Sequence, residues 1–138
     1  MNVTELPFNN FIGLKISDNN EFLLMLENRP EYRNHLQTVH ASALFALAEA
    51  SSGYFLLNEF PELTTDIVPV VRRAETKYKR PVTGRIFSKA KFQEREKDEV
   101  LYLLRHKGRA LFKVEVSLFD EAGAQAMQSI FEWFVTKL

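Results

Sequence analysis

The sequence predicts an α+β fold, in which a curved antiparallel β-sheet wraps around one long central helix and a short second helix precedes the penultimate strand. Three observations predict it: one long apolar segment without proline, later segments in which apolar and polar residues alternate, and turn-forming residues between them. The chain has 138 residues, about the length of one domain. Because no linker, internal repeat or domain boundary interrupts it, we expect residues 1–138 to form a single domain.

The composition is that of a globular protein, with 46% hydrophobic and 26% charged residues and only 5 Gly and 5 Pro. These values exclude disordered, collagen-like and low-complexity chains. The absence of cysteine excludes disulfide scaffolds, thiolate zinc sites and cysteine nucleophiles. The N-terminus shows no basic segment followed by an apolar one, so no signal peptide is visible and we expect a cytoplasmic protein.

The N-terminal part of the chain predicts a β-hairpin. Residues 11–16 are mostly apolar and are expected to form a short strand. Residues 17–20, with the sequence Ser-Asp-Asn-Asn, favour a turn, and residues 21–27 are expected to return as a second strand. A polar stretch that contains Pro30 follows the hairpin up to residue 37.

Residues 39–57 predict the long helix. Such a helix is about 28 Å long, so a membrane span has to be considered. We reject it because Glu49 lies near its middle, and one carboxylate there costs roughly 2.5–3.5 kcal/mol on insertion scales. A helix that is apolar nearly all round is instead expected to be enclosed by its own protein.

Four further strands and the short helix follow. The alternation of apolar and polar residues predicts strands at 66–80, 85–92, 110–118 and 124–137. Pro81 and Gly84 favour a turn between the first two. The highly charged segment 94–107 has apolar residues at helical spacing, and Gly108 stands where a helix C-cap is expected.

Glu49 is the only acidic residue of the long helix, and a buried carboxylate must be paired, protonated or exposed to a cavity. At about 100° per residue, Ser42 lies roughly 20° from the same line along the helix, and Ser52 and Gly53 lie within roughly 60° of it. Such a small, polar stripe suits a ligand cleft. The alternative is that Glu49 forms an ion pair with an arginine or lysine at a subunit interface.

The start of the helix offers a second chemical feature. Its first turn leaves backbone N–H groups unsatisfied, and these suit a carbonyl oxygen that becomes negative during attack. His40 lies about 180° from Glu49 on the helix, so we expect it to cap or orient rather than to act as a base. His35 and His106 have no partners at metal-ligand spacing. Phosphate loops, dinucleotide fingerprints and nucleophile elbows are absent.

Charge is distributed unevenly along a chain whose net charge is zero. Residues 1–71 contain 3 basic and 9 acidic residues, whereas residues 72–97, the basic block, contain 10 basic and 3 acidic ones, a net charge of +7. The basic block predicts a polyanionic ligand, and the alternative is a solvated strand surface. Nucleic acid is disfavoured, because the block has few aromatic residues and no RNA-binding aromatic motif.

The segment from Asn34 to Glu49 resembles the signature of the hotdog-fold thioesterases, in particular the PaaI-like acyl-CoA branch. That signature reads Asn, then His-Gly-Gly, then an acid nine residues after the histidine. Here His40-Ala41-Ser42 stands in place of His-Gly-Gly with the same spacing. Glutamate occupies the acid position, where the PaaI-like branch more often has aspartate.

Two further segments resemble the same family. Gly108-Arg109, which leads a strand ending at residues 120–123, is similar to the family's late strand pair. Residues 80–84, Arg-Pro-Val-Thr-Gly, resemble the turn after its third strand. The resemblance covers nearly the whole chain in order and length.

The resemblance implies a hotdog fold, a homodimer or a homotetramer, and active sites at a dimer interface where an acyl-CoA thioester is hydrolysed. The Ala41 N–H would stabilise the oxyanion, and Glu49 of the other subunit would act as general base or nucleophile. Asn34 would orient water or carbonyl, and His40 completes the catalytic set. The substrate would be contacted by Ser42, Thr76, Arg80 and Arg109, with Arg80 on the CoA phosphates. No cofactor, metal, nucleic acid or membrane partner is implied.

Other functions on this fold stay open. A non-catalytic acyl-CoA-binding protein is favoured by the Ala41-Ser42 replacement of the two glycines. A dehydratase or hydratase would need a histidine and an acid that converge on one acyl chain, and the sequence has no matching histidine motif. The carrier (coenzyme A or acyl carrier protein) and the acyl group are undetermined. Seven aromatic residues could line an aliphatic or an aromatic pocket: Phe45, Phe55, Phe87, Phe92, Phe112, Phe131 and Trp133.

Overall fold

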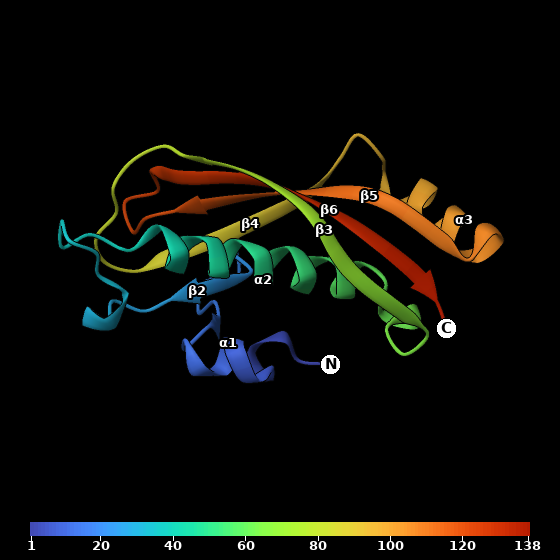
Figure 1. The fold of residues 1–138 in the computed structure, drawn as a ribbon, viewed down its shortest axis with the longest axis horizontal. Coiled ribbons are helices and arrows are strands. Elements are labelled where there is room, and N and C mark those ends of the chain that lie inside the picture. Colours follow the sequence, from blue (N-terminus) through green and yellow to red (C-terminus); the bar gives the residue numbers. More distant parts are fainter.

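The computed structural model describes residues 1–138 and shows a curled antiparallel sheet that wraps around one long helix, α2 (Figure 1). The strand order is β1-β2-β4-β5-β6-β3, and all neighbouring strands are antiparallel. The strand bounds are Lys15–Ile16 (β1), Leu24–Leu26 (β2), Ile67–Tyr78 (β3), Ile86–Gln93 (β4), Arg109–Phe119 (β5) and Gln125–Lys137 (β6). The predicted fold class is confirmed.

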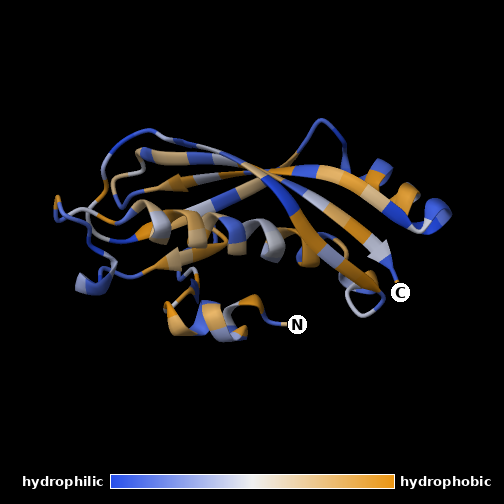
Figure 2. Ribbon diagram, in the orientation of Figure 1, coloured by the Kyte–Doolittle hydropathy of each residue, from blue (hydrophilic) through white to orange (hydrophobic).

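The long strands have one buried and one more exposed face. Along β5, every second residue from Ala110 to Leu118 is buried and the residues between them are partly or fully exposed. Figure 2 shows hydrophobic and hydrophilic residues alternating along this strand and along β6. β3 lies at the edge of the sheet and pairs only with β6, so one row of its backbone N–H and C=O groups is free.

Helix α2 (Ala41–Glu59) is enclosed from two sides. The concave face of the sheet covers one side, and the short 3-10 helix η1 (Val3–Glu5) contacts the other. Because both sides are covered, apolar residues occur nearly all round the helix. None of the helices combines the length and the apolarity that a membrane crossing requires.

Buried hydroxyl groups fix α2 against the sheet. Ser51 Oγ donates to the Leu47 carbonyl and lies 2.6 Å from Ser88 Oγ of β4. Ser88 Oγ in turn accepts a hydrogen bond from the Leu24 N–H at 3.1 Å. Since buried polar groups are costly unless they are hydrogen-bonded, these contacts define how far along the sheet the helix lies.

The predicted strand over residues 11–16 is wrong for its first four residues. Pro7–Phe11 form the short helix α1, and only Lys15–Ile16 pair with β2. Proline is tolerated in the first turn of a helix, where the backbone N–H has no helical partner. Gly13, with a φ of 77°, then redirects the chain into β1. The predicted hairpin is confirmed, since β1 and β2 pair antiparallel.

Helix α3 (Lys97–Lys107) precedes β5, as the charged segment predicted. Asp98 and Glu99 lie in its first turn, and three basic residues lie in its last turn. Charges of these signs interact favourably with the helix dipole and stabilise both ends of the helix. Gly108 ends the helix with a φ of 71° and donates its N–H to the Leu104 carbonyl at 3.2 Å. The C-cap predicted from the sequence is confirmed.

The same substitution is expected to have opposite effects at two glycines. Gly108→Ala puts a Cβ into a left-handed conformation with no heavy atom within 4 Å, so strain alone should lower the free energy of unfolding by about 1–2 kcal/mol. Gly53 lies inside α2, where an added Cβ would meet the Trp133 ring at 3.6 Å, an ordinary van der Waals contact. Gly53→Ala should therefore raise the free energy of unfolding by about 0.5–1 kcal/mol. Urea unfolding measures both, and changes of equal sign would contradict this account.

Candidate functional site

The N-terminus of α2 presents one backbone donor without an acceptor. His40 caps the helix: its Nδ1 accepts a hydrogen bond from the Ser42 N–H at 2.9 Å, and its carbonyl accepts from the N–H groups of the next turn. The Ala41 N–H donates to no group in the chain. Because the helix dipole adds partial positive charge at this end, the Ala41 N–H suits a carbonyl oxygen.

Asn34 organises the loop that leads into α2. Its Oδ1 accepts hydrogen bonds from the Leu36 N–H at 2.9 Å and the Thr38 N–H at 3.1 Å. Its Nδ2 lies 3.0 Å from Thr38 Oγ1. Within this chain, Asn34 therefore closes the turn over residues 34–38 and fixes the approach to His40.

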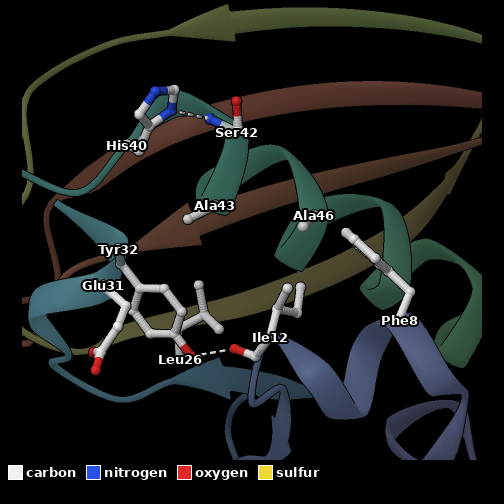
Figure 3. Close-up of a pocket in the computed structure, with 9 residues that line it drawn as sticks. All are labelled: Phe8, Ile12, Leu26, Glu31, Tyr32, His40, Ser42, Ala43 and Ala46. Atoms are coloured by element: carbon white, nitrogen blue, oxygen red, sulfur yellow. Dashed lines mark hydrogen bonds between the residues drawn. The ribbon is translucent and has the colours of Figure 1, made fainter. Parts of the chain in front are cut away.

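A cavity of about 290 Å³, the α1 cavity, opens beside the helix start (Figure 3). It lies between α1, β2 and the first half of α2. Six of its nine lining residues are hydrophobic. His40 and Ser42 stand at the end where α2 begins, and Phe8 stands at the other end (Figure 3). The cavity thus joins the helix start to an apolar interior.

Glu49 lines a separate cavity of about 320 Å³ between η1, α2 and the residues Pro69 and Trp133 of the sheet. Its carboxylate forms no hydrogen bond or ion pair within the chain. Burial therefore raises the pKa of the Glu49 carboxyl above its ordinary range. A carboxyl group of this kind is a candidate acid–base residue.

One chain does not bring the Ala41 N–H and the Glu49 carboxylate together. The two residues are about 12 Å apart along the helix axis and rotated by about 80°. Consistent with this, His40 and Ser42 line the α1 cavity and Glu49 lines the other. A site that uses both groups needs one of them from a second chain.

Only some residues of the polar stripe expected along α2 line a cavity. Ser52 is buried: its Oγ accepts a hydrogen bond from Trp133 Nε1 at 3.1 Å and donates to the Glu49 carbonyl at 2.7 Å. The serine therefore fastens the helix to β6 and does not face a ligand. Glu49 and Gly53 line the second cavity, and Ser42 lines the α1 cavity.

Arg80 lies beside the start of α2. The Tyr78 hydroxyl, two residues before it, donates to the Ala41 carbonyl at 3.5 Å. Two residues after it, the Val82 carbonyl accepts the Val39 N–H at 2.8 Å. Because both neighbours contact the helix start, the Arg80 backbone lies close to the N-terminus of α2.

Thr76 and Arg109 occupy different places on the sheet. Thr76 Oγ1 is 2.7 Å from Ser129 Oγ, on the face that α2 covers. Arg109 pairs with Thr136 of β6, whereas Tyr78 pairs with Met127. Met127 and Thr136 are nine residues apart along β6, a distance of roughly 30 Å, so within one chain Arg109 lies far from the start of α2.

Most of the basic block is neutralised within the chain. Six of its ten basic residues form ion pairs, mostly with carboxylates from other parts of the sequence: Arg72, Arg85, Lys89, Lys91, Arg95 and Lys97. The four that pair with no carboxylate are Arg73, Lys77, Lys79 and Arg80. These four, the free cations, lie on β3 and just after it. The solvated-surface interpretation holds for β4, and the anion-binding interpretation is restricted to β3 and its end.

Sequence reasoning missed the residues that line the α1 cavity from α1. Phe8 of α1 and Ile12 just after it line the cavity. The strand expected at 11–16 included Ile12, and no element was expected at Phe8. Most of the aromatic residues considered for an acyl pocket lie in the core instead. Phe45 packs on Phe131 with ring centroids 5.6 Å apart, and Phe92 contacts other aromatic rings of this set: Phe55 and Phe112.

The sequence matches the model of a domain of unknown function, DUF4442, over residues 5–135. The chain belongs to the DUF4442 family. Its fold is the hotdog fold, as comparison with solved structures shows. A probable thioesterase from Pseudomonas aeruginosa superposes with a TM-score of 0.80 at 23% identity, over 99% of this chain and 91% of that protein.

Two further solved structures extend the comparison of this DUF4442 protein. A thioesterase from Haemophilus influenzae gives a TM-score of 0.75 at 16% identity, with 99% and 87% of the two chains covered. A protein from Bacillus halodurans, solved with CoA, gives 0.64 at 18% identity, with 81% and 65% covered. At these identities the likeness establishes the fold. No curated protein matches the sequence.

Glu49→Gln is expected to leave this DUF4442 protein at least as stable at neutral pH. Because burial raises the pKa of Glu49, its protonation stabilises the folded state, and that contribution is present at acidic pH and lost as pH rises through the raised pKa. The glutamine amide cannot ionise, so the melting temperature of the Glu49→Gln variant should equal or exceed that of the wild type at pH 7. Near pH 4 the variant should lose this advantage, because Glu49 is then protonated in the wild type. A lower melting temperature at pH 7 would indicate a structural ion pair.

Proposed function

We propose that this DUF4442 protein hydrolyses acyl-CoA thioesters at sites shared between two subunits. One observation carries the proposal: the unpartnered Ala41 N–H opens beside a mainly apolar cavity, while the same helix holds a partly buried, unpaired carboxylate at Glu49. The first suits the carbonyl oxygen of a thioester and the second suits activation of water. The hotdog structures of the P. aeruginosa probable thioesterase and the H. influenzae thioesterase support this chemistry.

The reaction proceeds at the carbonyl carbon of the thioester. The carbonyl oxygen accepts the Ala41 N–H, which stabilises the negative charge that develops on attack. Glu49 of the second subunit takes a proton from water as the water oxygen attacks the carbon. The C–S bond then breaks, and the proton passes to the departing thiolate, giving a carboxylic acid and a free thiol. In the alternative route, the Glu49 carboxylate attacks the carbonyl carbon, the C–S bond breaks and the thiolate leaves and takes a proton from water. Water then hydrolyses the resulting anhydride, which releases the carboxylic acid and restores Glu49.

Asn34 and His40 act on this geometry through the backbone. Asn34 holds the loop 34–38, and His40 caps the helix, so the two residues fix the direction of the Ala41 N–H. As the resembling signature implies, Asn34 would also orient the water or the carbonyl. Ser42 lines the α1 cavity beside the reacting carbonyl.

The second subunit is required because one chain separates the two groups by about 12 Å along the helix. The free edge of β3 offers the place for it. Pairing of two β3 strands across a two-fold axis would satisfy the free N–H and C=O groups of both edges. The same contact would bring the uncovered parts of the two α2 helices toward each other.

Coenzyme A is the carrier that the charge distribution favours. CoA holds a diphosphate and a 3′-phosphate, and the free cations supply four positive charges near the start of α2 and along β3. Arg80 is the best placed of them, because its neighbours Tyr78 and Val82 contact the helix start. The B. halodurans structure with CoA supports the choice of carrier.

Non-catalytic binding of acyl-CoA is the second candidate. The Ala41 methyl group and the Ser42 side chain stand at the helix start, where the resembling thioesterases have two glycines. Both residues are exposed there, so they narrow the approach of a thioester. Hydrolysis assays on a series of acyl-CoA substrates distinguish this candidate from an active thioesterase.

Two defective variants are expected to restore each other when mixed. Ala41→Pro removes the N–H at the first helical position, where proline is tolerated, and His40 already has the extended conformation that precedes proline, with φ −61° and ψ 139°. This variant should lose about 100–1,000-fold in kcat. Glu49→Gln should lose at least about 100-fold. Ala41→Gly keeps the N–H and serves as the matched control.

Subunits of the two variants are then exchanged by reversible dissociation. In a mixed dimer, one site contains an intact Ala41 and an intact Glu49, so random mixing should restore about a quarter of the wild-type activity. Light scattering follows the oligomeric state of each sample. A stable monomer of 16.0 kDa, or a mixture no more active than its components, would contradict the shared site.

Arg80→Ala is expected to weaken CoA-thioester binding. Loss of a charge-assisted phosphate contact should raise KM about tenfold or more with little change in kcat, because the phosphates lie far from the reacting carbon. The effect should disappear with a pantetheine thioester, which lacks these phosphates. Arg95→Ala is the control, since Arg95 is already paired with Glu99 at 2.6 Å. An equal rise in KM for both substrates would show that Arg80 does not bind phosphate.

A further inference from the structure

The α1 cavity is lined mainly by apolar side chains. Its walls are aliphatic and aromatic carbon from α1, β2 and α2, including Ile12, Leu26 and Ala43. Glu31 is its only acidic lining residue and is exposed. A volume of about 290 Å³ lies at the small end of the range for ligand pockets. Such a space accepts an uncharged, apolar group of limited size.

The hydroxyl of Tyr32 does not add a polar contact to this lining. It donates to the Ile12 carbonyl at the end of α1 (Figure 3), so the ring presents carbon to the cavity. The Tyr32 carbonyl also accepts the His40 N–H at 2.6 Å. Tyr32 therefore fixes the α1 wall and the helix cap relative to each other.

The two ends of the cavity differ. His40 and Ser42, the neighbours of Ala41, stand at one end, and Phe8 stands at the other, next to Ala46 (Figure 3). An acyl chain whose carbonyl oxygen accepts the Ala41 N–H would run along α2 toward Phe8. The Phe8 side chain, which is 63% exposed, would cover the far end of the chain, and the small Ala46 side chain leaves the path toward it open.

We propose that the α1 cavity holds the acyl group of the substrate, selects uncharged apolar acyl groups, and has its length limit set by Phe8 and Ala46. This inference rests on the proposed function, since it concerns the substrate of the same site. According to this inference, α1 determines which acyl groups bind, although it lies outside the hotdog sheet and its central helix.

The test measures binding without catalysis. S-(2-oxoalkyl)-CoA thioethers, from oxopropyl to oxohexadecyl, keep a carbonyl oxygen for the Ala41 N–H and resist hydrolysis. Their Kd values are measured by titration calorimetry for the wild type and three variants. Ala46→Leu fills the cavity and Phe8→Ala extends it. Phe11→Ala is the matched control, because Phe11 lies on the same helix, is 84% exposed and does not line the cavity. Melting curves establish that each variant is folded.

In the wild type, each added methylene should tighten binding by about fourfold until the chain fills the cavity, after which further methylenes add nothing. The length at which the gain stops should be shorter in Ala46→Leu, longer in Phe8→Ala and unchanged in Phe11→Ala. A thioether that ends in a carboxylate should bind more weakly than its alkyl counterpart of equal length, because the buried charge has no partner.

An unchanged length limit in both Ala46→Leu and Phe8→Ala would overturn the inference, and so would the absence of thioether binding. Hydrolysis of the matching thioesters is measured in the same samples, which separates the two proposals. Length-dependent binding without hydrolysis would support the acyl cavity and contradict only the thioesterase activity. Hydrolysis with a length profile that neither variant changes would overturn the acyl cavity and leave the activity standing.

Discussion

Enclosure of α2 is the constraint on which the rest of the structure depends. A helix with apolar residues on nearly all sides is stable in water only when protein covers all of them. The sheet curls around one side, and the segment that precedes β1 covers much of the other. Burial of Leu47 and Ala48 without residual exposure shows how completely the sheet side is closed.

The two groups that can perform chemistry lie where this enclosure is incomplete. The sheet and the N-terminal segment leave the first turn of α2 open, so the Ala41 N–H has no acceptor. On the second side of the helix the cover is incomplete, and Glu49 lies in the gap with a raised pKa. A carboxylate without a partner in such a place destabilises the fold, and this is the pattern expected of a group retained for function.

The antiparallel strand order decides which charges remain available. It brings Glu115 of β5 within 3.3 Å of Lys91 on β4 and Glu132 of β6 within 3.5 Å of Arg72 on β3. Such exposed pairs add little stability individually, yet they remove cations from any anion-binding surface. Within the basic block, the positive charge that remains lies on β3 and just after its end, near the start of α2. The same edge is free to pair with a second chain.

Besides the capping role of His40 and the isolation of the Glu49 carboxylate, the sequence by itself determined α2, α3 and the strands β3 to β6. Their bounds agree within three residues, because strand alternation, helical spacing and caps such as Gly108 are local signals. The angular separation of His40 and Glu49 likewise follows from helix geometry alone. Tertiary structure alone decided the rest, since a short apolar segment takes the conformation that its packing surface favours. Residues 7–11 thus form a helix that packs on η1, and this helix lines the α1 cavity together with α2. Contacts between residues far apart in sequence also decided which cations stay unpaired and placed Arg109 at the distant end of the sheet.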